Sequence, residues 1–138
     1  MKKALATILA LVMAIGLCSV SWADEGVTTA EALNTAVGAG GEVKLGANIS
    51  ATITIPADKT VTLDLNGYSI TSAGQVIMNN GKLTITDNKG GGKIVSTGNI
   101  AIGVGSNSVT NIQKAIVESV EGAVITGRAT GATINIYD

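Results

Sequence analysis

The chain has 138 residues, one domain's worth, and its nine Lys and Arg residues nearly balance its ten Asp and Glu residues to give a net charge of −1. This balance excludes the basic surface that nucleic acid or an anionic membrane requires. The chain contains no histidine, no phenylalanine and a single cysteine, so we expect neither a histidine-based catalytic or zinc site nor a disulfide framework.

Residues 1–23 have the pattern of an export signal, and we exclude them from the fold. Lys2 and Lys3 precede an apolar run, and Ser21-Trp22-Ala23 places small residues at the two positions that a signal peptidase reads. The alternative is a transmembrane anchor, because the run is nearly long enough to span a bilayer. We favour cleavage after Ala23, which predicts a protein that is secreted or displayed on the cell surface and has no membrane span.

Residues 24–138 are expected to form a single domain that begins with a helix over about residues 28–37. Thr28 and Glu31 have the spacing of a capping box, and Gly38 is expected to end the helix. A stack of short strands needs a cover over its first apolar layer, so we predict that this helix is a cap. The alternative is an ordinary surface helix on another β fold.

The clearest strand is Val61–Gly67, V-T-L-D-L-N-G, in which apolar and polar residues alternate. Its last two residues, Asn66 and Gly67, tolerate positive φ and predict a tight turn. Weaker copies follow along the chain, and their threonines at 62, 84, 110 and 133 are 22, 26 and 23 residues apart. A repeat of this length, built from short strands and turns, is typical of a solenoid.

Each repeat divides into three short strands separated by Gly- and Asn-rich corners, which predicts an all-β parallel β-helix of about four to five coils. The first side of the coil contains Val61–Leu65, Lys82–Thr86, Val109–Gln113 and Ala132–Tyr137. The second side contains Tyr68–Thr71, Lys93–Ser96 and Ala115–Glu118. The third side contains Gln75–Met78, Ile100–Val104 and Ala123–Thr126. The alternative, an antiparallel β-sandwich, ranks second because the repeated unit has three strands.

A family resemblance covers about residues 28–138. After the predicted helix, the chain contains in order the segments G-G-E-V-K-L-G-A-N-I, K-T-V-T-L-D-L-N-G-Y-S-I, N-G-K-L-T-I-T-D-N, G-G-G-K-I and A-T-I-N-I-Y-D. This order resembles the right-handed parallel β-helix modules of bacterial secreted and cell-surface proteins, which belong to the pectate-lyase-like superfamily. The resemblance implies a right-handed coil. It also implies a place beside anchoring or adhesive domains in surface proteins.

The resemblance implies two enzyme classes to consider. Polysaccharide lyases of this type need clustered acidic calcium ligands and a basic residue, and hydrolases need paired acids. Asp64 and Asp87 fall on neighbouring coils, which gives a calcium-site hypothesis. We favour the interpretation that they are a solvated charge and an Asx-type corner. Arg128, the only arginine, lies far from them in sequence. We therefore expect a non-enzymatic module without a cofactor.

Polar residues on the first side are the candidate binding face for a glycan or surface partner. We expect one outward column of Thr62, Thr84, Thr110 and Thr133, and beside it a column of Asp64, Thr86 and Asn135. A regular threonine array can also order water, as in ice-binding solenoids. The plainest interpretation, which we favour, is that threonine is a good strand residue on a wet face.

Two structural expectations complete the prediction. Asn66, Asn88 and Asn111 are candidates for an asparagine ladder at successive corners, and we expect this role only for Asn66. Val124, Ile134 and Ile136 are expected to form a last apolar layer through which the chain self-associates.

The leading hypothesis is an exported, non-enzymatic β-helix with a structural or adhesive role. The second is a fragment or remnant of a carbohydrate-active β-helix enzyme, and the third is an ice-binding face.

Overall fold

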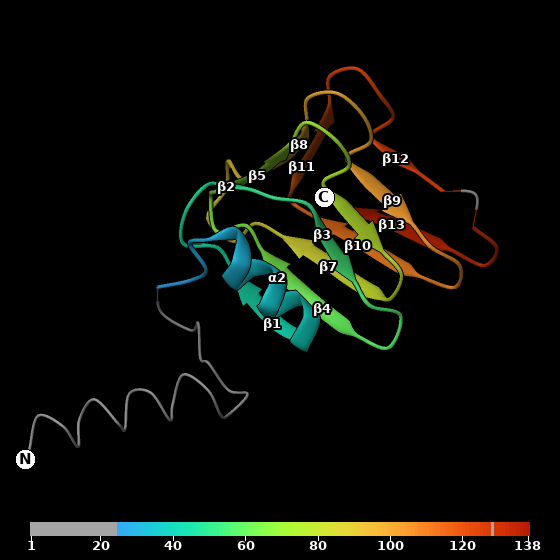
Figure 1. Cartoon of the computed structure of the whole chain (residues 1–138), viewed down its shortest axis with the longest axis horizontal. Helices are drawn as coiled ribbons and strands as arrows, with labels where there is room; N and C mark the ends of the chain where they lie inside the picture. The colour runs from blue at the N-terminus through green and yellow to red at the C-terminus, as the bar shows by residue number, and fades with distance from the viewer. Residues whose placement is uncertain (1–24, 128) are drawn as a thin grey trace, which may run out of the picture.

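The computed structural model describes residues 25–127 and 129–138. They form an all-β parallel solenoid of about four turns, with one short helix near the amino-terminal end (Figure 1). The predicted export signal and Arg128 lie outside the described residues.

The strands form three parallel sheets, one for each side of the coil (Figure 1). The first sheet contains β1 (Gly41–Lys44), β4 (Thr60–Asp64), β7 (Lys82–Thr86), β10 (Val109–Gln113) and β13 (Thr133–Tyr137). The second sheet contains β2 (Ile49–Ser50), β5 (Ser69–Ser72), β8 (Lys93–Ser96) and β11 (Ile116–Ser119). The third sheet contains β3 (Ile53–Ile55), β6 (Ile77–Asn79), β9 (Ile102–Val104) and β12 (Ile125–Thr126). The predicted division into three sides is confirmed, and the antiparallel sandwich is wrong.

Helix α2 (Ala30–Ala39) covers the first coil, as predicted. It buries Leu33, Ala36 and Val37 and packs against β1 and β3 (Figure 1). These side chains close the amino-terminal end of the apolar interior, which would otherwise face water.

The capping box predicted at Thr28 and Glu31 is wrong, because the helix begins later. Its N-cap is Thr29, whose Oγ1 accepts a hydrogen bond from the backbone N–H of Ala32 at 3.2 Å. Val27 lies in a parallel bridge beside Leu45 and donates its N–H to Lys44 O, and the first helical carbonyl is that of Thr29, which accepts from Leu33 N–H at 3.0 Å. The helix also continues past Gly38 and ends at Ala39, with Gly40 at φ 86° as its C-cap.

The core consists of aligned ladders of inward-facing aliphatic side chains. Val43, Leu63, Ile85 and Ile112 occupy the same position on β1, β4, β7 and β10, and all four are buried. Burying each such side chain contributes about 1.5–3 kcal/mol relative to leaving it exposed. This register fixes which residues of the first sheet face outward, and so it fixes the candidate site.

The turn after β4 has the geometry that its sequence predicts. Asn66 and Gly67 have φ values of 51° and 82°, and Tyr68 N–H donates to Leu65 O at 2.8 Å. The Asn66 side chain donates from Nδ2 to Leu45 O of the preceding coil at 2.9 Å. The two residues thus form a tight turn at positive φ, and the Asn66 amide bonds the backbone of the preceding coil, whereas a bond to the next coil was expected.

Candidate functional site

The candidate site is the outward face of the first sheet, where polar side chains repeat in rows across the strands. The central row consists of Glu42, Thr62, Thr84, Asn111 and Asn135. The neighbouring row consists of Lys44, Asp64, Thr86, Gln113 and Tyr137. Because adjacent strands lie about 4.8 Å apart, each row offers one polar group at every such step along the solenoid.

Part of the central row is joined by hydrogen bonds between side chains. Asn135 donates from Nδ2 to Asn111 Oδ1 at 2.8 Å. Asn111 in turn donates from Nδ2 to Thr84 Oγ1 at 3.3 Å. Each bond constrains the next, so the two amides are held in one orientation on the face before any ligand arrives.

Thr110 does not belong to the outward face, so the predicted threonine column is wrong at this position. Thr110 pairs in register with Leu83 and Ile134, and its side chain is fully buried. The reason is that Ile112, two residues later on the same strand, occupies a core position and fixes the alternation. Asn79 satisfies the buried hydroxyl, because its Nδ2 donates to Thr110 Oγ1 at 2.8 Å.

The other predicted column members are divided among three rows. Thr62 and Thr84 are direct neighbours, as are Asp64 and Thr86, which confirms those two pairs. Thr133 lies in a third row with Val109, so its predicted alignment with Thr84 is wrong. Asn135 was expected beside Asp64 but follows Asn111 in the central row.

Sequence reasoning missed Glu42 and Lys44 on β1 and, on β10, Asn111 and Gln113. Asn111 was expected at a corner, but it lies within β10 on the outward side. Counting the alternation from Ile112, rather than from the threonine, would have placed both β10 residues outward.

The carboxylate of Asp64 is held by backbone and side-chain donors at two successive corners. Its Oδ1 accepts hydrogen bonds from the N–H of Asn66 at 2.9 Å and the N–H of Asn88 at 3.1 Å. Its Oδ2 accepts from Asn88 Nδ2 at 2.9 Å. Asn88 therefore bonds a carboxylate rather than extending the asparagine ladder.

Asp87 is nearly fully buried at the corresponding corner of the next coil. Its Oδ1 accepts from the N–H of Gly67 at 2.8 Å and of Gly90 at 3.1 Å, and its Oδ2 accepts from Gly92 at 2.6 Å. Burial by itself raises the pKa of this carboxyl, but the backbone N–H donors, led by Gly92, hold the pKa below its ordinary value. Asp87 is thus an ionised group that organises the corner.

Neither aspartate is arranged as an open metal ligand. Their oxygens receive N–H donors, whereas a calcium ligand directs its lone pairs at the ion. Within residues 25–127 and 129–138, no group of three or more His, Cys, Asp or Glu residues is placed to hold a metal ion.

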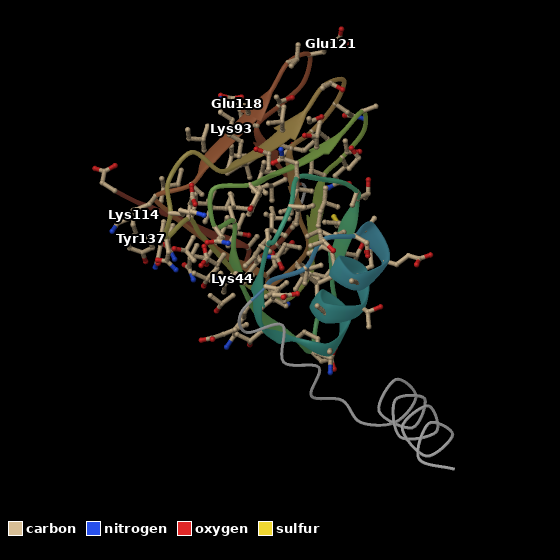
Figure 2. The ribbon with its side chains drawn as sticks, turned by 90° about the vertical axis from the view of Figure 1, so that its left-hand side faces the viewer. Lys44, Lys93, Lys114, Glu118, Glu121 and Tyr137 are labelled. Carbon is tan, nitrogen blue, oxygen red and sulfur yellow. The ribbon has the colours of Figure 1, made fainter. Side chains whose placement is uncertain are left out.

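One ion pair lies on the second sheet, away from the candidate face. Lys93 and Glu118 form an ion pair of 3.0 Å on β8 and β11, and both side chains are exposed. Figure 2 shows this pair well away from Tyr137, which lies beside Lys114. Such an exposed pair contributes little to stability, about 0–1 kcal/mol.

Tyr137 is the aromatic group that the candidate face offers. Its side chain is 51% exposed and ends the row that contains Thr86 and Gln113. Tyr68 instead packs partly buried against the core cluster. A ring beside amides and hydroxyls is the combination that sugars contact, because the ring accepts their apolar faces and the polar groups bond their hydroxyls.

Comparisons of the chain with protein-family models, with curated proteins and with solved structures found no match. In the part of the chain that the structure describes, no helix has the length and apolar character to cross a membrane.

Proposed function

We propose that the chain is an exported, non-enzymatic β-helix module that adheres to polysaccharide through the outward face of its first sheet. The observation that carries the proposal is the ordered row of Thr84, Asn111 and Asn135, in which the amides are fixed by hydrogen bonds of 3.3 and 2.8 Å. A linear array of donors and acceptors with a constant strand-to-strand spacing suits an extended polymer with repeated hydroxyl groups.

The adhesive proposal is favoured over ice binding by the composition of the same row. Thr62 and Thr84 are followed by Asn111 and Asn135, so the repeat of hydroxyls ends after two strands. Mixed amides and hydroxyls provide both strong donors and strong acceptors, as sugar hydroxyls require.

The non-enzymatic part of the proposal is supported by the environment of the acids. Asp64 and Asp87 would be the acids of a lyase or hydrolase site, yet both are engaged by corner N–H groups. Oxygens that already accept N–H donors have fewer free lone pairs to offer a substrate, and for Asp87 the lowered pKa is the opposite of what a general acid needs. The second hypothesis, a remnant of a carbohydrate-active enzyme, is an outcome that the experiment below distinguishes.

We also propose that the solenoid is right-handed and of the pectate-lyase-like class, and that the protein belongs to the bacterial cell surface or exterior. Parallel strands of one sheet are joined by right-handed crossovers in nearly all known cases, which supports the handedness. The pattern of residues 1–23 supports export.

The experiment is retention of the protein on a panel of insoluble and immobilised polysaccharides, with and without calcium. The full sequence is expressed in a bacterial host, the exported product is purified, and its amino terminus is identified by mass spectrometry. Supernatants are assayed for new reducing ends and for unsaturated ends. Retention without cleavage, unchanged by calcium, is the expected result. New chain ends would support the enzyme remnant instead, and absence of retention on every polysaccharide would overturn the adhesive proposal.

A further inference from the structure

The chain contains two Asn-Gly sequences, Asn66-Gly67 after β4 and Asn80-Gly81 after β6. In such a pair the glycine nitrogen can attack the side-chain carbonyl carbon of the asparagine, because glycine has no side chain to hinder the approach. The nitrogen forms a bond to Cγ, the Cγ–Nδ2 bond breaks, and the amide leaves as ammonia with the proton of the glycine. Water then opens the cyclic imide to give aspartate or isoaspartate, so water is the only reagent that this deamidation needs.

At Asn66-Gly67 the fold engages both reacting groups. The Gly67 N–H donates to Asp87 Oδ1 at 2.8 Å, and Asn66 Nδ2 donates to Leu45 O at 2.9 Å. Asp87 follows β7 on the next coil, whereas Leu45 follows β1 on the preceding coil. The attacking nitrogen and the leaving amide are therefore held by different coils, and the reaction requires these bonds to break.

The backbone of this corner opposes the reaction as well. Asn66 and Gly67 have φ values of 51° and 82°, and the Asn66 N–H donates to Asp64 Oδ1 at 2.9 Å. The Tyr68 N–H closes the turn by donating to Leu65 O at 2.8 Å. To form the imide ring, the Gly67 nitrogen must rotate onto the side chain of Asn66, and this rotation disrupts the turn.

The second pair is held by other groups. The Gly81 N–H donates to Asn79 Oδ1 at 3.0 Å, and the Asn80 N–H donates to Ile55 O at 3.0 Å. Here the acceptor of the glycine N–H is a neutral amide, whereas Gly67 donates to a carboxylate, and hydrogen bonds to an ionised acceptor are stronger. Of the two pairs, Asn66-Gly67 is thus the one whose protection depends on Asp87.

We infer that Asn66 is a deamidation site that Asp87 keeps unreactive in the folded chain, and that its reaction is confined to chains in which this corner has opened. The product cannot restore the corner, because a carboxylate at position 66 has no N–H to donate to Leu45 O. An isoaspartate also adds one atom to the backbone of the turn. The modification is therefore one-way, and this inference does not depend on the polysaccharide-binding proposal, because it concerns the corner chemistry.

The test is site-resolved mass spectrometry of the exported full-sequence product, incubated at neutral pH in buffer and in concentrated urea. Fragment ions locate each gain in mass at Asn66 or at Asn80. Asp87→Asn is the variant, because it keeps an acceptor oxygen for Gly67 but removes its charge. Asn80-Gly81 is the control within the same molecule, since unfolding of the whole chain would accelerate both sites. Circular dichroism verifies that the native chain and the variant are folded in buffer.

We expect Asn66 of the folded native chain to deamidate at least about tenfold more slowly than in urea, because the reaction must wait for local opening. Folded Asp87→Asn is expected to react about fivefold faster at Asn66, with the rate at Asn80 unchanged, because a neutral acceptor holds the Gly67 N–H less strongly. Equal rates at Asn66 in buffer and in urea would overturn the inference, a comparison that needs only the native chain. Equal acceleration of both sites in Asp87→Asn, or of neither, would overturn the role of Asp87. After long incubation in urea, the refolded fraction should retain Asn66, and full refolding of deamidated chains would contradict the one-way step.

Discussion

Asp64 and Asp87 lie on successive coils, and each carboxylate accepts a backbone hydrogen bond from the corner that follows the other aspartate. Asp64 accepts the N–H of Asn88 at 3.1 Å, one residue after Asp87, and Asp87 accepts the N–H of Gly67 at 2.8 Å, three residues after Asp64. The two carboxylates thereby join the corners that follow β4 and β7, just beyond the last pair of the strand ladder, Asp64 and Thr86. This reciprocal arrangement holds the edge of the candidate face in position.

Replacing Asp87 by Asn is expected to lower the free energy of unfolding by about 2–4 kcal/mol. The amide offers one acceptor oxygen where the carboxylate offered two, and buried N–H groups left without a partner are costly. Asp64→Asn is the matched control and should cost about 1 kcal/mol, because Asp64 is only partly buried. Urea unfolding of both variants provides the measurement, and equal losses would contradict the difference in burial.

Stability should fall when the pH falls below about 4, the ordinary pKa of an unfolded aspartate. Because the folded-state pKa of Asp87 is lowered, the unfolded chain takes up this proton more readily than the folded chain. The contribution is fully present above the unfolded pKa and is lost as the pH falls through the folded pKa. Thermal unfolding between neutral and strongly acidic pH should show this loss, and Asp87→Asn should show a shallower one.

The buried pair of Asn79 and Thr110 should respond unequally to substitution. Asn79→Ala is expected to cost about 2–4 kcal/mol, because Gly81 N–H loses its acceptor and a cavity forms. Thr110→Val should change stability by less than about 1 kcal/mol, since Asn79 Nδ2 still donates to Val109 O. Chemical denaturation of both variants is the check, and a larger loss for Thr110→Val would be inconsistent with this network.

The helix cap gives a prediction that separates two adjacent residues. Thr29→Ala should cost about 1 kcal/mol, because the Ala32 N–H loses the side-chain oxygen that caps it. Thr28→Ala should change stability by less than about 0.5 kcal/mol, as a substitution outside the cap. Unfolding midpoints of the two variants, compared under the same conditions, would show the reverse order if the cap were at Thr28.

Much of the fold could be predicted from the sequence because the alternation of apolar residues and the Gly and Asn corners are local signals. Val61–Leu65 and Lys82–Thr86 were placed on one side of the coil, and the structure pairs them in register. The position of α2 as a cap also followed from its apolar face, although its N-cap is Thr29 rather than Thr28.

The register of β10 could not be read from threonine spacing, because threonine tolerates both faces of a strand. Burial of Thr110 depends on a partner, Asn79, that lies 31 residues earlier and is brought close only by the coiling of the chain. The consequence for the site is that two amides, Asn111 and Asn135, occupy a row where threonines were expected. The core position of Ile112 thus sets the composition of the candidate binding face, and the long-range contact with Asn79 satisfies the hydroxyl that this register buries.

The most direct test of the account is an equilibrium titration with a polysaccharide that the retention panel identifies, using the native chain, Asn111→Ala and Thr54→Ala. Asn111→Ala removes the amide that links Thr84 to Asn135, whereas Thr54→Ala removes an exposed outward threonine of the third sheet. We predict about five- to tenfold weaker binding for Asn111→Ala, a loss of about 1 kcal/mol, and native affinity for Thr54→Ala. Native affinity for Asn111→Ala, or an equal loss for Thr54→Ala, would contradict the assignment of binding to the first sheet.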